Sequence, residues 1–233
     1  MNRKFPKHLI LPCLIFLISA GCSFSENEKT EGGETVPEIV IPLTPQTPQK
    51  PGLPPLPAKK LPADNFVDIQ NLISPRLFFD IRYAKSTNFT GKVIYDEENC
   101  FLESKTAAAL LKAYEAAQKL EPPRTFIIYD CYRPPYAQQR LWDAFPNASY
   151  VAPPAKGSRH SRGTAVDLTL AYMDGAPVEM PTDFDVFSPL AHMNYEGKNL
   201  PPAARQNREL LKKLMTEAGF LYTRTEWWHY HMP

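Results

Sequence analysis

The chain lacks any long run of basic side chains. Its 233 residues carry 26 Lys and Arg against 25 Asp and Glu, a formal net charge of +1. Proteins that bind nucleic acid usually gather Lys and Arg in a patch or stripe, and the sequence shows no such cluster. We therefore expect no nucleic-acid partner.

The chain also lacks an apolar stretch of about 20 residues, the length that a membrane-spanning helix needs. Its apolar run from Leu9 to Ala20 is shorter and follows three basic side chains within the first eight residues. A basic start followed by a short apolar run is typical of a secretory signal. The sequence therefore predicts a signal over residues 1–21 and an exported protein.

Residues 19–22 read Ser-Ala-Gly-Cys, which resembles the cleavage box of bacterial lipoproteins. The resemblance implies that Cys22 carries a lipid and that a membrane is a partner through this anchor. The protein would then face the periplasm or the cell exterior. Ser19 stands where such boxes prefer Leu, so ordinary signal cleavage with an unmodified Cys22 stays open as the alternative.

Cysteine is scarce, with four residues in the chain. Cys13 lies in the predicted signal and Cys22 is the lipid candidate, so Cys100 and Cys131 remain. No Cys-X-X-Cys or Cys–His spacing surrounds them, which argues against a catalytic or redox role. Because disulfides persist in exported proteins, these two form a candidate disulfide, with two separate buried thiols as the alternative.

Large apolar residues are rare over residues 22–62, where nine prolines lie between positions 37 and 62. Such a segment cannot bury a core and favours extended polyproline II structure. We predict a lipid-anchored, proline-rich linker that holds the following domain away from a membrane. A proline-rich ligand for another protein is the alternative.

Residues 63–233 are long enough for one domain with a hydrophobic core. Their strands and helices do not alternate regularly, which favours an α+β fold over a doubly wound sheet. We expect a single catalytic domain with a mostly antiparallel sheet flanked by helices. The expected strands are 78–83, 125–130, 165–170 and 227–232, and the expected helices are 103–120, 134–144 and 205–218.

Two polar segments carry the chemistry of this domain. The first contains His160, Gly163 and Asp167, and the second contains Glu226 and His229 beside a Trp pair. Two imidazoles, a carboxylate and a spare glutamate meet the needs of a catalytic zinc site, which uses three protein ligands, an open position and a base. Asp167 lies in an apolar run, where a carboxylate is costly unless it is paired or bound to metal.

The residues alone leave alternatives for these ligands. Asp167 could instead pair with Arg159 or Arg162. On a regular strand, residues three apart point to opposite faces, so Glu226 must precede the last strand or lie at a bulge to share a site with His229. His231 would lie on the same face as His229 and is a competing ligand.

The patterns S-x-H-x-x-G-x-A-x-D and E-x-W-H resemble those of the zinc D,D-peptidases, a family that shares its fold with the hedgehog signalling domain. Within it, the sequence is more similar to the D-alanyl-D-alanine dipeptidases of the vancomycin-resistance type. Segments 83–91, 130–134 and 180–185 support this resemblance, which covers most of residues 65–233 in the expected order.

The resemblance implies one zinc ion per chain and a small D,D-dipeptide substrate, hydrolysed by water that the metal activates and Glu226 deprotonates. It assigns metal binding to His160, Asp167 and His229, catalysis to Glu226 and Arg133, and substrate binding to Ser158, Tyr83 and Asp185. Two positions depart from the family pattern. Pro181 stands where glycine is usual, and Cys131 where a small residue is common.

Other functions remain open at this point. The same metal site would serve a D,D-carboxypeptidase or endopeptidase that cuts peptidoglycan stem peptides. A zinc-stabilised binding module on the cell surface would need neither Glu226 nor Arg133, and Arg133 could instead form a structural ion pair with Asp130 or Asp143. Non-haem iron also uses two His and one carboxylate, but those sites usually read His-X-Asp.

Overall fold

The structure is a computed structural model that describes residues 60–72 and 77–233. The predicted signal, Cys22 and the linker up to residue 59 lie outside the described residues. In the described part of the chain, no helix has both the length and the apolar character needed to cross a membrane.

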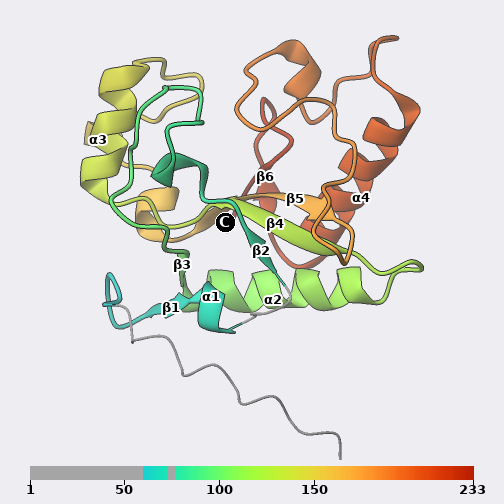
Figure 1. The fold of residues 1–233 in the computed structure, drawn as a ribbon, viewed down its shortest axis with the longest axis horizontal. Helices are drawn as coiled ribbons and strands as arrows, with labels where there is room; N and C mark the ends of the chain where they lie inside the picture. Colours follow the sequence, from blue (N-terminus) through green and yellow to red (C-terminus); the bar gives the residue numbers. More distant parts are fainter. Residues whose placement is uncertain (1–59, 73–76) are drawn as a thin grey trace, which may run out of the picture. The chain divides into compact units, whose positions relative to one another are not determined.

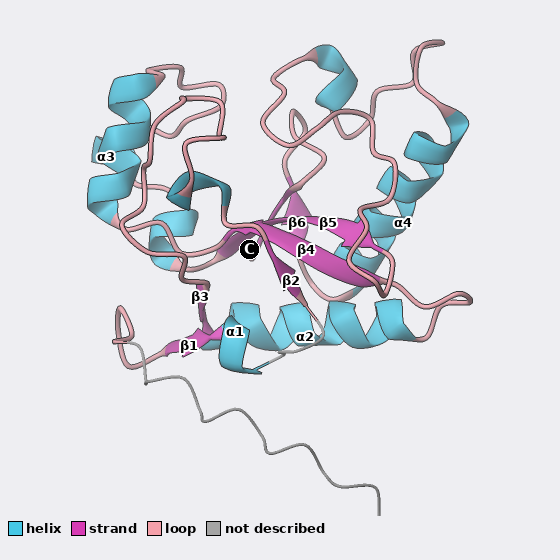
Figure 2. Ribbon diagram, in the orientation of Figure 1, coloured by secondary structure: helices cyan, strands magenta, loops and turns pink. Residues whose placement is uncertain are grey.

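A five-stranded sheet forms the centre of the domain (Figures 1 and 2). β2 runs parallel to β4, and the other three neighbouring pairs are antiparallel. This confirms the expected α+β fold with a mostly antiparallel sheet. In spatial order the strands are β2 (Phe78–Phe79), β4 (Thr125–Asp130), β5 (Ala165–Ala171), β7 (His229–His231) and β6 (Leu221–Tyr222).

Two long helices pack against the central strands of this sheet. α2 (Ser104–Gln118) and α4 (Pro202–Glu217) contact each other and also contact strands β4 and β5. In Figure 1, α2 lies below the sheet and α3 (Pro135–Ala144) lies above it. Two short elements pair beside α2: β1 (Phe66–Asp68) runs antiparallel to β3 (Phe101–Glu103), and α1 (Ile69–Leu72) follows β1 directly.

Helix ends follow ordinary capping chemistry. The Glu103 carboxylate accepts hydrogen bonds from the backbone N–H groups of Lys105 and Thr106 at the start of α2, which satisfies two donors that have no partner inside the helix. Pro202 occupies the first turn of α4, where proline costs no hydrogen bond. The structure also contains four short 3₁₀ helices, at Arg82–Ala84, Pro154–Lys156, His160–Arg162 and Pro189–Ala191.

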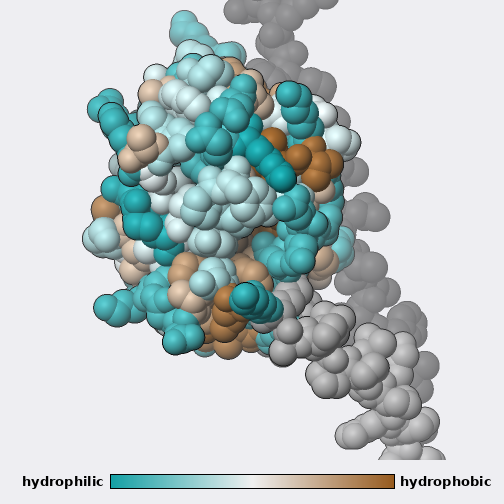
Figure 3. Space-filling model, turned by 90° about the vertical axis from the view of Figure 1, so that its left-hand side faces the viewer, coloured by the Kyte–Doolittle hydropathy of each residue, from teal (hydrophilic) through white to brown (hydrophobic). Residues whose placement is uncertain are grey.

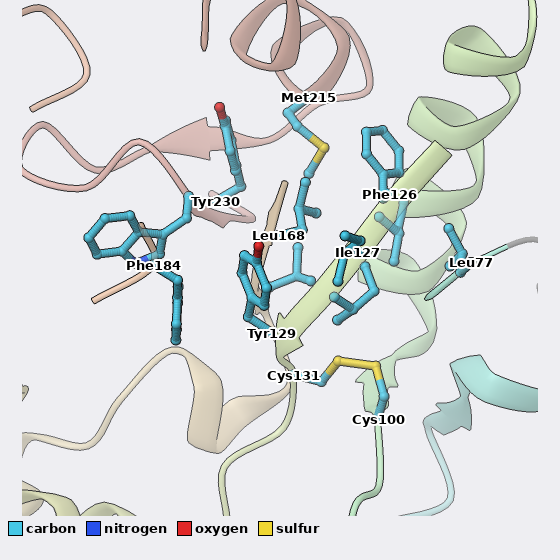
Figure 4. Close-up of a cluster of buried hydrophobic side chains, with 14 of the residues drawn as sticks. Leu77, Cys100, Phe126, Ile127, Tyr129, Cys131, Leu168, Phe184, Met215 and Tyr230 are labelled. Atoms are coloured by element: carbon cyan, nitrogen blue, oxygen red, sulfur yellow. A yellow bond between two sulfur atoms is a disulfide. The ribbon is translucent and has the colours of Figure 1, made fainter. Parts of the chain in front are cut away.

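The two central strands form the core. Every residue of β4 and β5 is buried, and β4 confirms the strand expected over residues 125–130. Leu168 of β5 and Met215 of α4 lie in one apolar cluster with Phe126 and Ile127 of β4 (Figure 4). Cys100 and Cys131 form a disulfide beside this cluster.

Two expected strands were wrong in extent. The strand expected over 78–83 ends at Phe79, and a 3₁₀ helix starts at Arg82. The chain turns because the Tyr83 carbonyl accepts hydrogen bonds from two later N–H groups, those of Ile94 and Tyr95. The last strand covers only His229–His231, since the Trp pair before it lies in a turn.

Candidate active site

All eight residues predicted for catalysis, metal binding and substrate binding line a single cavity of about 310 Å³. They come from five parts of the chain that lie far apart in sequence. The eight residues are Tyr83, Arg133, Ser158, His160, Asp167, Asp185, Glu226 and His229.

The three predicted metal ligands face one another. Asp167 of β5 and His229 of β7 are direct partners in the antiparallel ladder, so strand register places their side chains together. His229 Nδ1 lies 2.8 Å from Asp167 Oδ1 and 3.1 Å from His160 Nε2. His160 Nε2 lies 3.4 Å from Asp167 Oδ2. Two nitrogens and a carboxylate therefore converge on one point.

These distances fit a zinc ion. Nitrogen and oxygen ligands about 2.0–2.1 Å from zinc in tetrahedral geometry are about 3.3 Å apart, and the separations here are 2.8–3.4 Å. Burial alone would raise the pKa of Asp167, but the facing His160 and His229 lower it well below its usual value. The carboxylate is therefore charged, as a metal ligand must be. The donor set matches a catalytic zinc site with three protein ligands.

His160 is held in the orientation that metal binding needs. Its Nδ1 lies 2.8 Å from the backbone oxygen of Cys131, and a donor on Nδ1 leaves the Nε2 lone pair directed at Asp167 and His229. His160 belongs to a 3₁₀ helix that Gly163 ends in a left-handed conformation, with φ +70. A Cβ at Gly163 would lie 2.3 Å from the Phe66 ring, so this position requires glycine.

Glu226 lies in the turn before β7 and reaches the same cavity as His229. This is one of the two placements that the sequence allowed. Burial raises the pKa of Glu226 to about 8, and the carboxylates of Asp167 and Asp185 act in the same direction. A glutamate with such a pKa can accept and return a proton near neutral pH.

Arg133 both lines the cavity and forms an ion pair with Asp130. The residue is 6% exposed, and its Nη2 lies 2.5 Å from Asp130 Oδ2. The ion pair with Asp130, which the sequence left open as an alternative to a catalytic role of Arg133, is therefore present. Arg133 lines the cavity as well. Burial alone would lower the pKa of Arg133, but the Asp130 carboxylate raises it well above its usual range, so the guanidinium stays charged.

Tyr83 and Asp185 form a second group of residues at the end of the cavity that lies outside the sheet ladder, and both line the cavity wall. The Tyr83 hydroxyl lies 3.0 and 3.2 Å from the two Asp185 oxygens and donates to this carboxylate. Burial raises the pKa of Asp185 well above its usual range, and the Asp167 charge adds to this effect. Asp185 has φ +61, the one positive φ outside glycine among the described residues, and such backbone is strained for a residue with a side chain.

The Trp pair of the second motif connects this end to the sheet. Trp227 and Trp228 are both 1% exposed. The Trp227 Nε1–H donates to Thr182 Oγ1 at 2.9 Å, which attaches the loop of Asp185 to the turn of Glu226. Trp228 lines the cavity itself. The two rings therefore support both ends of the cavity.

The structure separates the remaining candidates. His231 lines a different pocket, and its Nδ1 is buried without a hydrogen-bond partner among the described residues. Asp167 forms no ion pair with Arg159 or Arg162. Ser158 is buried at the cavity wall, where its hydroxyl accepts the backbone N–H of His160.

Sequence reasoning missed Tyr95 and Gln138, which contact Arg133. Neither residue lies in a recognised pattern, and only the tertiary fold brings them to the guanidinium. An Asp three residues before Arg133 was the one available signal for this cluster.

Comparison with known proteins agrees with this geometry. A family model described as D-ala-D-ala dipeptidase matches residues 63–233. The D-alanyl-D-alanine dipeptidase of Escherichia coli K12 is 41% identical over 162 residues, which cover 70% of this chain and 82% of that protein. The D-alanyl-D-alanine dipeptidase of Enterococcus faecalis V583 is 33% identical over 175 residues, with coverage of 66% and 85%.

Similarity extends to more distant proteins. The D-alanyl-D-alanine dipeptidase of Streptomyces coelicolor is 30% identical over 191 residues, covering 71% of this chain and 90% of that protein. Among solved structures, a mutant of the vancomycin resistance D,D-pentapeptidase VanY in complex with Zn(II) aligns with a TM-score of 0.39 and 16% identity, over 59% of this chain and 75% of that one. On the family model and these sequence relatives, the chain belongs to the D-ala-D-ala dipeptidase family, a family of zinc metallopeptidases.

Proposed function

We propose that this chain hydrolyses D-alanyl-D-alanine to two molecules of D-alanine, with a zinc ion held by His160, Asp167 and His229. The observation that carries the proposal is the meeting of these three ligands with Glu226 and Arg133 in one small cavity. When bound, zinc would acidify water and polarise the scissile carbonyl.

Each remaining step uses a side chain of this site. Glu226 takes a proton from the attacking water and passes it to the amine of the departing D-alanine. The buried guanidinium of Arg133 stabilises the oxyanion that forms at the carbonyl carbon, a role often worth about 3–4 kcal/mol per donor.

The part of the cavity wall around Asp185 suits a free dipeptide. A D,D-dipeptide carries an ammonium group close to its scissile bond, and the Asp185 carboxylate can pair with it. Pairing with a cation would lower the pKa of Asp185, which burial raises. A longer stem peptide has an uncharged amide at that point, and leaving Asp185 without a cation would cost binding energy.

The alternative of a zinc-stabilised binding module has less support. A structural zinc site usually has four protein ligands and no open position, whereas three converge here beside a glutamate and an arginine. The face of the domain in Figure 3 is mostly hydrophilic, and its apolar side chains lie in small separate patches. That face offers no broad apolar docking surface.

The test measures release of D-alanine from D-Ala-D-Ala by the purified, zinc-loaded chain. We expect steady turnover by the unchanged chain and a fall in kcat of about 10²- to 10⁴-fold for Glu226→Gln, the usual contribution of a general base. Zinc content should stay at one per chain in both proteins, which separates loss of the base from loss of the metal.

A stem pentapeptide with a D-Ala-D-Ala terminus supplies the comparison substrate. Cleavage of the pentapeptide but not the dipeptide would replace the dipeptidase with a D,D-carboxypeptidase. If the zinc-loaded chain cut neither substrate, the binding module would become the better interpretation.

We also infer that the protein is exported and anchored through a lipid on Cys22. The support is the short apolar run and the cleavage box around this cysteine. Cells that express the full chain in the presence of labelled fatty acid should label it, and Cys22→Ala should abolish the label. Labelling that persists in this variant would contradict the anchor.

A further inference from the structure

The buried carboxylate of Asp130 lies behind the cavity wall and contacts both halves of the site. It is 0% exposed. Its Oδ2 accepts hydrogen bonds from Nε and Nη2 of Arg133, at 3.2 and 2.5 Å. The same oxygen lies 3.4 Å from Nδ1 of the metal ligand His160. No sequence motif assigned a role to this residue.

The second oxygen of Asp130 is fixed as well. Oδ1 accepts the Tyr95 hydroxyl at 2.5 Å and the backbone N–H of Cys131 at 2.9 Å. The Tyr95 hydroxyl also accepts from Arg133 Nε at 3.3 Å. With both oxygens engaged, the carboxylate cannot rotate without breaking several bonds, and it holds one orientation toward Arg133.

The contacts of Arg133 divide its donors into two groups. A guanidinium has five N–H donors in a fixed planar fork. Nε and one N–H of Nη2 bind Asp130 and Tyr95, and one N–H of Nη1 binds Gln138 Oε1 at 3.0 Å. One N–H on each terminal nitrogen has no acceptor in the described part of the chain. Since Arg133 lines the cavity, these two N–H groups are available to bind a substrate oxygen.

From these contacts we infer that Asp130, fixed by Tyr95, is a positioning residue that aims the two free N–H groups of Arg133 at the developing oxyanion. The inference rests on the proposed function, because it gives Arg133 the oxyanion as its target. A side chain as long as arginine loses much rotamer freedom when it is held in place. Asp130 and Tyr95 supply that restraint before substrate arrives, as preorganised catalysis requires.

The backbone extends the same coupling to the metal ligand. The N–H of Arg133 donates to the carbonyl of His160 at 3.1 Å. The carbonyl of Cys131 in turn faces His160 Nδ1. Residues 130–133 therefore place the cationic donor and the first metal ligand relative to each other, and Asp130 is the side chain of that segment whose carboxylate lies against both.

A double-mutant cycle on the zinc-loaded full chain tests the inference. Asp130→Asn keeps the shape of the side chain and removes its charge. We expect kcat to fall by about 10²-fold, the lower cost of losing one oxyanion donor, with little change in KM. In an Arg133→Met background the same change should cost almost no further activity, because Asp130 acts through Arg133. Equal losses of kcat in the two backgrounds would overturn the inference.

Tyr95→Phe supplies a variant whose fold is undisturbed, since only a hydroxyl is lost. Because the hydroxyl bonds to a charged carboxylate, its removal should lower kcat by about 10-fold. Tyr114→Phe is the matched control, because the Tyr114 hydroxyl is also buried but has no partner among the described residues, and its kcat should not change. Equal kcat values for Tyr95→Phe and the unchanged chain would contradict the fixing role of Tyr95.

A readout without catalysis separates this inference from the proposed function. If the unchanged chain does not cleave the dipeptide, the proposed function fails, and crystal structures of the unchanged chain and Asp130→Asn still test the positioning role. We expect the guanidinium of Arg133 to leave its place in the variant while zinc stays bound at His160. A guanidinium that keeps its position without the Asp130 charge would overturn the inference.

Discussion

The cavity is lined by two groups of residues that are positioned in different ways. His160, Asp167 and His229, which we call the metal end, are placed by paired strands and a 3₁₀ helix. Tyr83 and Asp185, which we call the loop end, lie in segments without paired strands. Strand register fixes Asp167 opposite His229, whereas Asp185 depends on a strained backbone and a few side-chain contacts. The metal end therefore derives its geometry from the sheet, and the loop end from individual side chains.

The largest expected effect comes from breaking the support of the metal end. Cys100 and Cys131 close a loop of 31 residues, and the chain-entropy model gives such a bridge about 3–4 kcal/mol. The Cys100→Ser/Cys131→Ser protein should lose that much free energy of unfolding in urea. Because the Cys131 carbonyl orients His160, zinc affinity should also fall, by about 10- to 100-fold. A double variant with unchanged urea midpoint and zinc affinity would show that the bridge supports neither.

A pair of glycines compares the two ends directly. Gly163, beside the metal ligand His160, and Gly91, on the segment after Tyr83, have φ +70 and +68. Ala at either position strains the backbone by about 1–2 kcal/mol, but only at Gly163 would its Cβ meet a neighbour, the Phe66 ring. Gly163→Ala should therefore lower the free energy of unfolding by about 1–3 kcal/mol more than Gly91→Ala. Equal free energies of unfolding for the two variants would mean that the Phe66 ring moves away from the new Cβ at little cost.

A substitution at the loop end should change substrate binding and leave the metal in place. Asp185→Asn removes the charge that pairs with the ammonium of the dipeptide, so KM should rise by about 10- to 100-fold, as for loss of a charged hydrogen bond. Asp183→Asn, in the same loop but exposed, is the matched control and should keep the original KM. Zinc affinity should be the same in all three proteins. A fall in zinc affinity with Asp185→Asn would show that the loop end also supports the metal ligands.

The smallest expected effect is a slope of stability with pH in the zinc-free protein. Burial raises the folded-state pKa of Glu226 to about 8, so the stability that its protonated form contributes is complete below the unfolded pKa. That contribution is lost as the pH rises through about 8, with a slope of about 1 kcal/mol per pH unit. Asp185 acts in the same direction.

Urea unfolding of the zinc-free protein between pH 5 and pH 8 measures this slope. Asp167, whose pKa is lowered, contributes stability that is lost only as the pH falls below its ordinary range, outside this window. Glu226→Gln should flatten the slope. An identical slope in the variant would assign the effect to other groups.

Most of the metal end was predictable from the sequence. The residues of the two motifs lie on or beside strands β5 and β7, and regular strand geometry relates sequence spacing to the face on which a side chain lies. The same geometry required Glu226 to precede its strand, as it does in the structure. At this end local spacing identified the candidate residues, and the family resemblance selected His229 over His231. Their meeting at one point required that β5 and β7 pair.

The arrangement around Arg133 and Asp185 was not predictable in the same way. Tyr95 lies in a segment without helix or strand and reaches Asp130 from 35 positions away in the sequence. The expected strand over 78–83 failed for a related reason, because hydrogen bonds from Ile94 and Tyr95 turn the chain at Tyr83. Tertiary contacts of this kind outweigh local propensity, and no periodic pattern of the sequence predicts them.

The disulfide also bears on how the site takes up its metal. Cys131 is covalently held to the segment that enters β3, and its carbonyl faces His160. A chain whose bridge has closed presents this imidazole already oriented, whereas a reduced chain must order it at the moment of metal uptake and lose conformational entropy then. The oxidised chain would thus bind the metal more tightly than the reduced chain.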